Sequence, residues 1–261
     1  MVQLGALSWD ELRKVLLEGT SAPVVPRYKA LFSVQQSAPS ATEAVATLSS
    51  ALPLQKDSVL LRHEAAYVLG QLGDASAIEP LRQILLDETE DEIVRHEAAE
   101  ALAALRSDDS EALVTELTAV AKNTCSEALR HTCQLAVEGL ERGRKEAEEA
   151  GRPALPLCVC QYSSKDPAEG LANATEKDIP WAASRLADDS LPLFERYQGM
   201  FTLRNVGGDG AVQALAKMLL SDSSSAVLRH EATGCEQPVE LTAMFLSENS
   251  ETCDLRTRYS T

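Results

Sequence analysis

The chain has 261 residues, 44% of them hydrophobic and only 4% aromatic, which suits one or two compact domains of closely packed small helices. Its formal net charge of −16 argues against a nucleic-acid partner, because phosphate binding requires a basic face. The acidity fits a positively charged substrate or partner, and it fits equally a surface that is acidic for solubility alone.

Cysteines and apolar runs give no sign of zinc or of a membrane. The six cysteines lack zinc-binding spacing, and the tight pair Cys158 and Cys160 has no histidine nearby. The first 15 residues contain no apolar signal core, and no stretch reaches 18 consecutive apolar residues. We therefore expect no membrane partner and a cytoplasmic protein with free thiols.

Paired helices are predicted from residue 8 to about residue 142. They cover residues 9–18, 27–36, 41–52, 58–72, 75–87, 92–105, 110–121 and 126–143. Capping residues lie at the starts of two of them (Asp57 and Ser58; Asp109 and Ser110), and turns contain Gly73-Asp74 or Ser107-Asp108.

The second helix of three pairs has the same apolar template. Residues recur at i, i+4, i+7 and i+11: Leu61, Ala65, Val68 and Leu72; Val94, Ala98, Ala101 and Leu105; Leu129, Cys133, Ala136 and Leu140. This spacing places one narrow buried stripe on each helix. Repetition of such a unit predicts an all-α solenoid of helical hairpins of the HEAT type.

The pattern stops and then resumes, which predicts two duplicated halves. Residues 143–178 contain three prolines and polar runs, and we expect a linker there. Further helices are expected at residues 179–187, 193–205 and 211–220, with a last one beginning at Ser225. The pattern Arg-Tyr-x-x-x-Phe at 27–32 returns at 196–201. The halves are thus residues 1–142 and 179–233. Residues 234–261 diverge, and Gly234 and Pro238 are expected to interrupt the final helix.

Arg-His-Glu triplets mark the repeat. They occur at residues 62–64, 95–97 and 229–231 and contain three of the four histidines. The fourth, His131, occupies the same position in the altered copy Arg130-His131-Thr132. The intervals from His63 to His96 and from His96 to His131 are 33 and 35 residues. At ~100° per residue each histidine lies opposite its helix's buried stripe. Histidines of successive second helices are therefore expected to line a shared concave surface.

The repeated pairs favour a metal site. A lone histidine in such a place is usually exposed or hydrogen-bonded, but repetition at one structural position favours a ligand role. Imidazole and carboxylate donors suit iron or manganese better than zinc or copper(I), and two halves could hold two metals. No phosphate loop, nucleophile elbow or H-E-x-x-H motif competes.

Residues beside the pairs have other expected roles. The arginines at this repeat position are expected to form a ladder of salt bridges or carbonyl bonds: Arg62, Arg95, Arg130 and Arg229, with Arg27 and Arg196 in the equivalent place. Glu100 and Tyr67 follow the histidines by one turn and share the groove face. Glu100 is a candidate carboxylate for a cationic substrate or, equally, a plain solvated side chain.

A resemblance to the deoxyhypusine hydroxylase family is found at residues 62–74, 94–102, 132–137 and 193–208, and the similarity runs from about residue 25 to residue 232 with the linker excluded. The resemblance implies a two-halved di-iron monooxygenase, an oxidoreductase of hypusine biosynthesis. Such an enzyme uses dioxygen to hydroxylate deoxyhypusine, a lysine extended by an aminobutyl group, on translation factor 5A.

The resemblance also implies site residues. It implies two Fe(II) ions, each with ligands from both halves, and the ligands it names are His63, Glu64, His96, Glu97, His230 and Glu231. It makes Glu64, Glu97 and Glu231 the catalytic carboxylates. Together with Glu100, these three are also candidates to hold the amines of the substrate, and Tyr67 is a further expected substrate-binding residue.

One departure from the family keeps an alternative open. The family has four His-Glu pairs and this sequence has three, with the next expected near residue 263, so we expect a truncated version with an incomplete metal set. The alternative is a metal-poor, inactive HEAT-repeat scaffold that binds a basic protein partner. A third possibility, a HEAT-type bilin lyase, is disfavoured by the repeated pairs.

Overall fold

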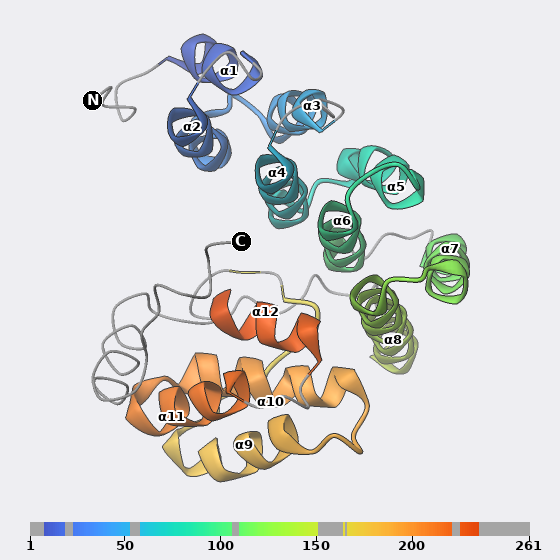
Figure 1. Cartoon of the computed structure of the whole chain (residues 1–261), viewed down its shortest axis with the longest axis vertical. Coiled ribbons are helices and arrows are strands. Elements are labelled where there is room, and N and C mark those ends of the chain that lie inside the picture. The colour runs from blue at the N-terminus through green and yellow to red at the C-terminus, as the bar shows by residue number, and fades with distance from the viewer. Residues whose placement is uncertain are drawn as a thin grey trace, which may run out of the picture. The chain divides into compact units, whose positions relative to one another are not determined.

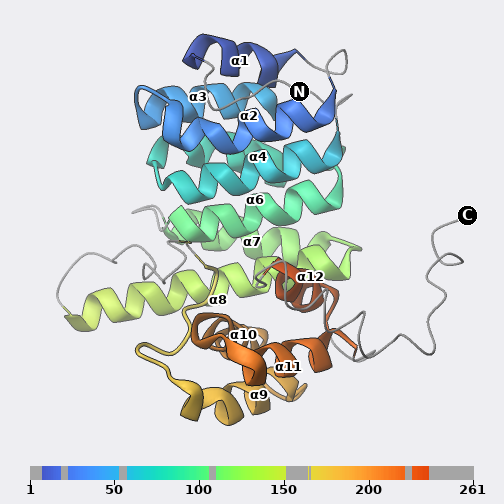
Figure 2. The ribbon, with the colours of Figure 1, turned by 90° about the vertical axis from the view of Figure 1, so that its left-hand side faces the viewer.

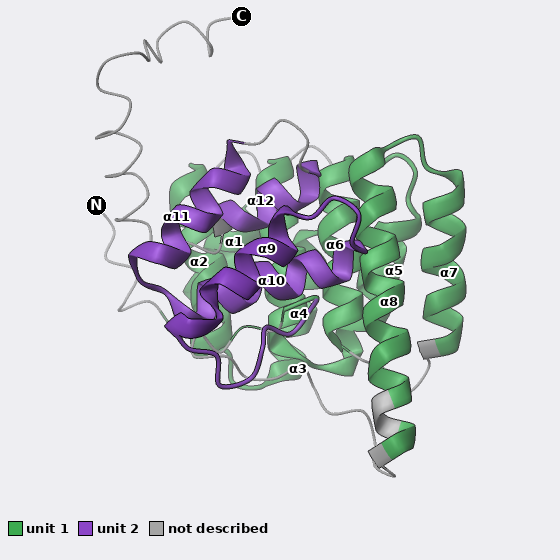
Figure 3. Ribbon diagram, turned by 90° about the horizontal axis from the view of Figure 1, so that it is seen from below, with its two compact units in different colours: residues 1–167 green, residues 168–261 purple. Residues whose placement is uncertain are grey.

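The computed structural model describes residues 8–18, 23–52, 58–105, 110–150, 164, 166–220 and 225–234. The chain divides into two compact units, Met1–Pro167 and Ala168–Thr261, which Figure 3 shows in different colours. Every secondary-structure element within the described residues is a helix, which confirms the predicted all-α class.

The first unit consists of four helical hairpins. Its α-helices are α1 (Trp9–Leu17), α2 (Val24–Ser37), α3 (Ala41–Ala51), α4 (Val59–Leu72), α5 (Ile78–Leu86), α6 (Glu92–Leu105), α7 (Ser110–Asn123) and α8 (Glu127–Ala150), and the short 3-10 helix η3 (Ala75–Ala77) precedes α5. Odd-numbered helices form one layer of this unit and even-numbered helices the other (Figure 1). Successive hairpins stack in chain order (Figure 2), which is the predicted HEAT-like arrangement.

Local signals set the helix ends. The Ser8 hydroxyl accepts from the Glu11 backbone N–H, and the Glu11 carboxylate accepts from the Ser8 N–H, so α1 begins with a capping box. The predicted cap Ser58 accepts from the Leu61 N–H at the start of α4. Helix α4 ends at Gly73, whose φ of 68° lies in the left-handed region that glycine adopts without a Cβ clash. Of the other expected signals, residues 57 and 107–109 lie outside the described residues.

The predicted stripes form the core of the first unit. Nearly all of their members are buried, and Leu72 and Leu105, at the ends of their helices, are partly buried. Burial of a leucine-sized side chain contributes roughly 1.5–3 kcal/mol, so these stripes are a main source of the free energy that holds neighbouring hairpins together.

The predicted arginine ladder is present at four of its positions. Arg27 donates to the Leu16 carbonyl, Arg95 to that of Leu85 and Arg196 to that of Leu186, each through Nε at 3.0 Å. Each bond satisfies a carbonyl at the end of the first helix of a hairpin, which has no partner within its own helix. Arg62 instead forms a salt bridge with Glu90 of the next hairpin.

The second unit contains η4 (Glu176–Asp178), α9 (Ile179–Ala187), α10 (Leu193–Val206), α11 (Gly208–Leu219) and α12 (Ala226–Gly234). Helices α9 and α10 cross closely at Gly199, where an added Cβ would lie 2.6 Å from the Ala182 carbonyl oxygen. None of the helices in the described parts of either unit is both long and apolar enough to cross a membrane.

Helix boundaries differ from prediction most clearly at α8. This helix continues to Ala150, so residues 143–150, assigned to the linker, are helical. Their charged residues and alanines are strong helix formers, and (i, i+4) pairs support the helix: Arg142–Glu138 at 2.9 Å and Arg144–Glu148 at 4.0 Å. At the other end of the chain, α12 is described to Gly234, and the predicted divergent tail beyond it lies outside the described residues.

Candidate metal centre

The first two His-Glu pairs come together on neighbouring helices of the first unit. His63 and Glu64 lie on α4, and His96 and Glu97 lie on α6. His63 Nε2 is 3.2 Å from Glu97 Oε2, and its Nδ1 is 3.5 Å from Glu64 Oε1. The imidazole rings of His63 and His96 stack with centroids 6.4 Å apart. Donor groups predicted from separate repeats therefore form one cluster.

Helix α6 alone offers three possible ligands. His96, Glu97 and Glu100 are all buried, and one donor atom from each lies within 4.8 Å of the others. Donors that share an ion through bonds of ~2.1 Å are at most about 4.2 Å apart, so only small side-chain adjustments are needed. A mixed nitrogen and oxygen donor set of this kind fits iron or manganese. Glu100, predicted to hold substrate, thus also lies where it could bind metal.

Close packing brings α4 and α6 together. A Cβ added to Gly70 would lie 2.8 Å from the Ala101 Cβ and 2.9 Å from its Cα, closer than two carbon atoms can approach. The absent side chain of Gly70 therefore allows the short distance between the two helices that carry the pairs.

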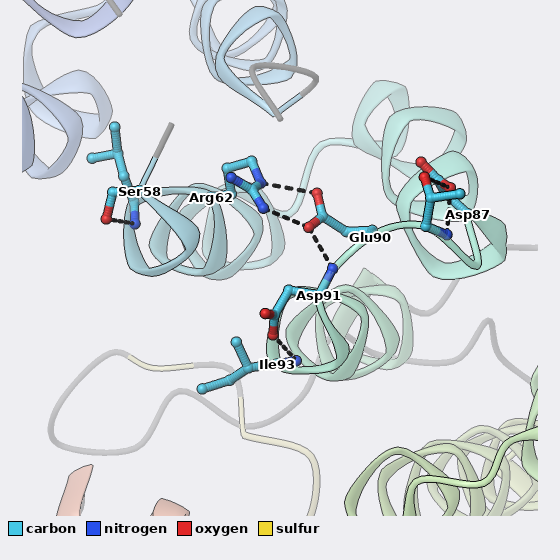
Figure 4. A network of polar contacts seen from close by, with 8 residues as sticks. Ser58, Arg62, Asp87, Glu90, Asp91 and Ile93 are labelled. Carbon is cyan, nitrogen blue, oxygen red and sulfur yellow. Dashed lines mark hydrogen bonds and ion pairs between the residues drawn. The ribbon is translucent and has the colours of Figure 1, made fainter. Parts of the chain in front are cut away.

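A buried polar network connects the same helices nearer their N-termini (Figure 4). Arg62 Nε donates to Glu90 Oε2 at 2.9 Å, and its NH2 group donates to Glu90 Oε1 at 2.6 Å. Glu90 Oε1 also accepts from the Asp91 N–H, and Asp91 Oδ1 accepts from the N–H of Ile93 in the first turn of α6. The residue before His63 is thus connected to the start of the helix that carries His96.

On α8, the even-numbered helix that follows α6, Thr132 contacts His96. The Thr132 Oγ1 is 2.6 Å from His96 Nδ1, and the threonine is fully buried. The neighbouring His131 faces elsewhere: its Nε2 lies 3.8 Å from Glu127 Oε1, and its side chain is 28% exposed. Of the altered triplet, Thr132 rather than the histidine reaches the cluster.

The remaining predicted residues of the first unit are more open. Glu64 is partly buried, and Tyr67 is exposed on α4. On α2, burial of the Tyr28 side chain, and secondarily the negative charge of Glu64, raises the pKa of Tyr28 to about 12. Tyr28 was not predicted as a site residue, although it belongs to the duplicated Arg-Tyr-x-x-x-Phe pattern.

The third pair lies in the second unit, on α12. His230 Nε2 is 3.9 Å from Glu231 Oε1, and the side chains are 43% and 19% exposed, respectively. His230 is therefore exposed and Glu231 is partly buried. Their predicted role as ligands stays a prediction.

Sequence reasoning missed Thr132 and Glu90. Thr132 occupies the position of Glu97 in the next copy of the repeat, and that alignment was the available signal. Glu90 lies in a turn without a recurring motif, so its pairing with Arg62 had no signal in the sequence.

Comparisons with known proteins agree with this architecture. A model of HEAT repeats matches residues 10–103 and 45–138. Deoxyhypusine hydroxylase of Saccharomyces cerevisiae is 36% identical over 233 residues, which cover 85% of this chain and 68% of the relative. The human protein of that name is 41% identical over 212 residues, 80% of this chain and 63% of the relative. A structure of human deoxyhypusine hydroxylase in complex with glycerol matches 94% of this chain and 78% of its own, with a TM-score of 0.76 and 34% identity.

Proposed function

The chain belongs to the deoxyhypusine hydroxylase family of enzymes, and from this we propose that it hydroxylates the deoxyhypusine side chain of translation factor 5A in hypusine biosynthesis. The observation that carries the proposal is the buried cluster of His63, His96, Glu97 and Glu100 on α4 and α6. We propose a cytoplasmic location for the reaction, because a reducing compartment keeps cysteines such as Cys125 as free thiols.

We propose Fe(II) as the cofactor, with two ions per chain as the resemblance implies. The ligands from the first unit are His63, Glu64, His96 and Glu97, and the sequence pattern alone adds His230 and Glu231. Bound iron would supply the redox chemistry by which one atom of dioxygen enters a C–H bond while the other leaves as water, with two electrons from a donor and two protons.

The buried carboxylates bind and orient the substrate. Glu97 and Glu100 are both buried, and Glu64 is partly buried beside them. Acidic groups gathered in a low-dielectric site are stabilised by a cation, whether a metal ion or an ammonium group. The deoxyhypusine side chain carries two amines, and we assign Glu64, Glu97, Glu100 and Glu231 to hold them. We assign Tyr67, which is exposed one turn after His63 on α4, to contact the aliphatic part of the side chain.

Histidines keep the cluster suited to a metal. Neutral imidazoles add nitrogen donors without adding negative charge, so fewer charges must be neutralised in the buried site. The contact of His63 with Glu97 fixes both side chains between α4 and α6, which limits the motion of the donor atoms.

Iron content and product formation test the proposal. Purified protein reconstituted anaerobically with Fe(II) is analysed for iron per chain, and deoxyhypusine-containing factor 5A is analysed by mass spectrometry for the addition of one oxygen atom. We expect His63→Ala and His96→Ala to lose iron and activity. His131→Ala is the matched control, because His131 occupies the same repeat position but faces Glu127, and it should retain both.

The iron count separates the alternatives. Two ions per chain with hydroxylation would support the full proposal, and one ion would restrict the centre to a single set of ligands. Wild-type protein that binds no iron and leaves the factor unmodified would contradict the proposal. Binding of the factor that survived chelation and both histidine substitutions would then indicate the metal-free scaffold.

A further inference from the structure

The Thr132 hydroxyl makes two contacts that together determine the direction of a hydrogen bond. Its Oγ1 is 3.0 Å from the backbone oxygen of Ala128 and 2.6 Å from His96 Nδ1. A carbonyl oxygen can only accept, so if both contacts are hydrogen bonds the single hydroxyl hydrogen is donated to Ala128. The contact with His96 then uses a lone pair of Oγ1, and Nδ1 must carry the hydrogen that it donates.

We propose that Thr132 is a positioning residue that holds His96 as the tautomer protonated on Nδ1. In a neutral imidazole only one ring nitrogen carries a hydrogen, so Nε2 keeps its lone pair and is the nitrogen that binds metal. This inference rests on the metal-binding role proposed for His96. In metal sites generally, a hydrogen bond from the other ring nitrogen fixes both the tautomer and the orientation of the ring.

The place of Thr132 in the repeat explains why this residue is a threonine. In each case the last residue of the triplet on one even-numbered helix contacts the histidine on the even-numbered helix before it. Glu97 reaches His63 at 3.2 Å, and Thr132 reaches His96 at 2.6 Å. A carboxylate at 132 would add another charged donor to a cluster that already contains Glu97 and Glu100. A hydroxyl can orient His96 without adding charge.

The environment makes the contact effective. Thr132 is fully buried and His96 is 4% exposed, so water competes little for either partner. Thr132 lies on α8, whose stripe residues Cys133 and Ala136 are buried in the core. A short helix-to-helix hydrogen bond on such a support holds the ring in one orientation.

Two variants of Thr132 and one control test the proposal. Thr132→Val keeps the shape and removes the oxygen, whereas Thr132→Ser keeps the hydroxyl. Thr115→Val is the control, because Thr115 on α7 makes the same bond to a carbonyl four residues earlier, that of Glu111 at 3.0 Å, and is exposed. Thr115→Val therefore removes only a hydroxyl-to-carbonyl bond within a helix and leaves His96 untouched.

The first readout is the tautomer of His96 in metal-free protein. Ring nitrogens are observed by NMR in protein labelled with ¹⁵N-histidine, and His96→Gln assigns the signals among the four histidines of the sequence. We expect wild type, Thr132→Ser and Thr115→Val to show His96 protonated on Nδ1, and Thr132→Val to lose this preference. A wild-type His96 protonated on Nε2, or a mixture of tautomers, would overturn the inference.

The second readout is the dissociation constant for Co(II), used as an oxygen-stable probe of the iron site. Loss of such an orienting contact typically weakens metal binding 10- to 100-fold. We expect at least about a tenfold loss for Thr132→Val, little change for Thr115→Val and recovery in Thr132→Ser. Equal affinity in Thr132→Val and wild type would refute a positioning role.

The two readouts keep the failures distinguishable. Wild type that binds neither Co(II) nor Fe(II) would contradict the proposed function, while the tautomer in metal-free protein still decides the structural inference. Should Thr132→Val fold poorly, the wild-type tautomer and its retention in Thr132→Ser remain decisive.

Discussion

The buried salt bridge between Arg62 and Glu90 is predicted to be a major determinant of the stability of the first unit. The Arg62 and Glu90 side chains are only 4% and 2% exposed, and two hydrogen bonds of 2.9 and 2.6 Å join them. Glu90→Gln removes the charge but keeps the size, so Arg62 loses a charged partner in a buried site. Breaking a buried pair in this way costs about 3–5 kcal/mol.

A second salt bridge between hairpins provides the matched control. Arg82 on α5 pairs with Glu116 on α7, but these side chains are 30% and 23% exposed. Solvent screens such a pair, and its loss costs about 0–1 kcal/mol. Glu116→Gln should therefore be destabilised by some 3 kcal/mol less than Glu90→Gln.

Urea denaturation followed by circular dichroism measures the difference in unfolding free energy. The double variant Arg62→Met/Glu90→Met should lie within about 1 kcal/mol of wild type or above it, because well-packed apolar residues can replace a buried pair. Glu90→Gln as stable as Glu116→Gln would refute the reasoning. So would a double variant as unstable as Glu90→Gln, since the loss would then not come from an uncompensated charge.

Three further predictions concern helix packing, thiol reactivity and the pH dependence of stability. Gly70→Ala should lower the free energy of unfolding by about 1–3 kcal/mol, because its Cβ would meet Ala101 at 2.8 Å. Gly210→Ala, whose nearest contact is 3.4 Å, should leave that free energy unchanged or raise it by up to about 1 kcal/mol. Thermal melting curves of both variants measure the difference, and equal effects would contradict the packing argument. Burial raises the pKa of the Cys133 thiol to about 12, so its thiolate is about a thousandth of the total at pH 9. Peptide mapping after brief alkylation should find exposed Cys125 modified and Cys133 protected, and rapid modification of both in folded protein would exclude this burial. Because the folded-state pKa of Cys133 is raised, the stability from its burial is present below the unfolded pKa of about 8.5 and is lost as pH rises toward 12, which urea midpoints at pH 8 and 11 in wild type and Cys133→Ala would show.

Fold class could be predicted because it depends on local periodicity. The stripe that begins at Leu61 returns at Val94 and Leu129, and burial of these positions requires only that successive hairpins stack. The end of α8 could not be predicted in the same way. Gly143 and the charge run that follows it are typical of a linker, but helix propensity and (i, i+4) pairs such as Arg142–Glu138 continue the helix to Ala150.

The residues of the candidate metal centre could be picked out from the sequence, but their partners could not. Repetition of His63 and His96 in one context was visible in the sequence. The contact between His96 and Thr132 joins residues 36 positions apart and depends on how α6 and α8 pack. Periodicity gives the face of a helix on which a residue lies, but not the atom that it meets on the next helix.

The precision that the proposed metal site requires gives a reason why α4 and α6 are fixed at two places. His63 lies seven residues from the Gly70 contact, about 10.5 Å along the helix at ~1.5 Å per residue. Metal–ligand distances tolerate about ±0.2 Å. If α4 pivoted at Gly70, a tilt of only about 1° would move His63 by that amount. A single close contact cannot prevent such a tilt, but the bond of Arg62 to Glu90, at the opposite end of the pair, does. The close approach at Gly70 and the buried salt bridge therefore act together to set the distance from His63 to Glu97.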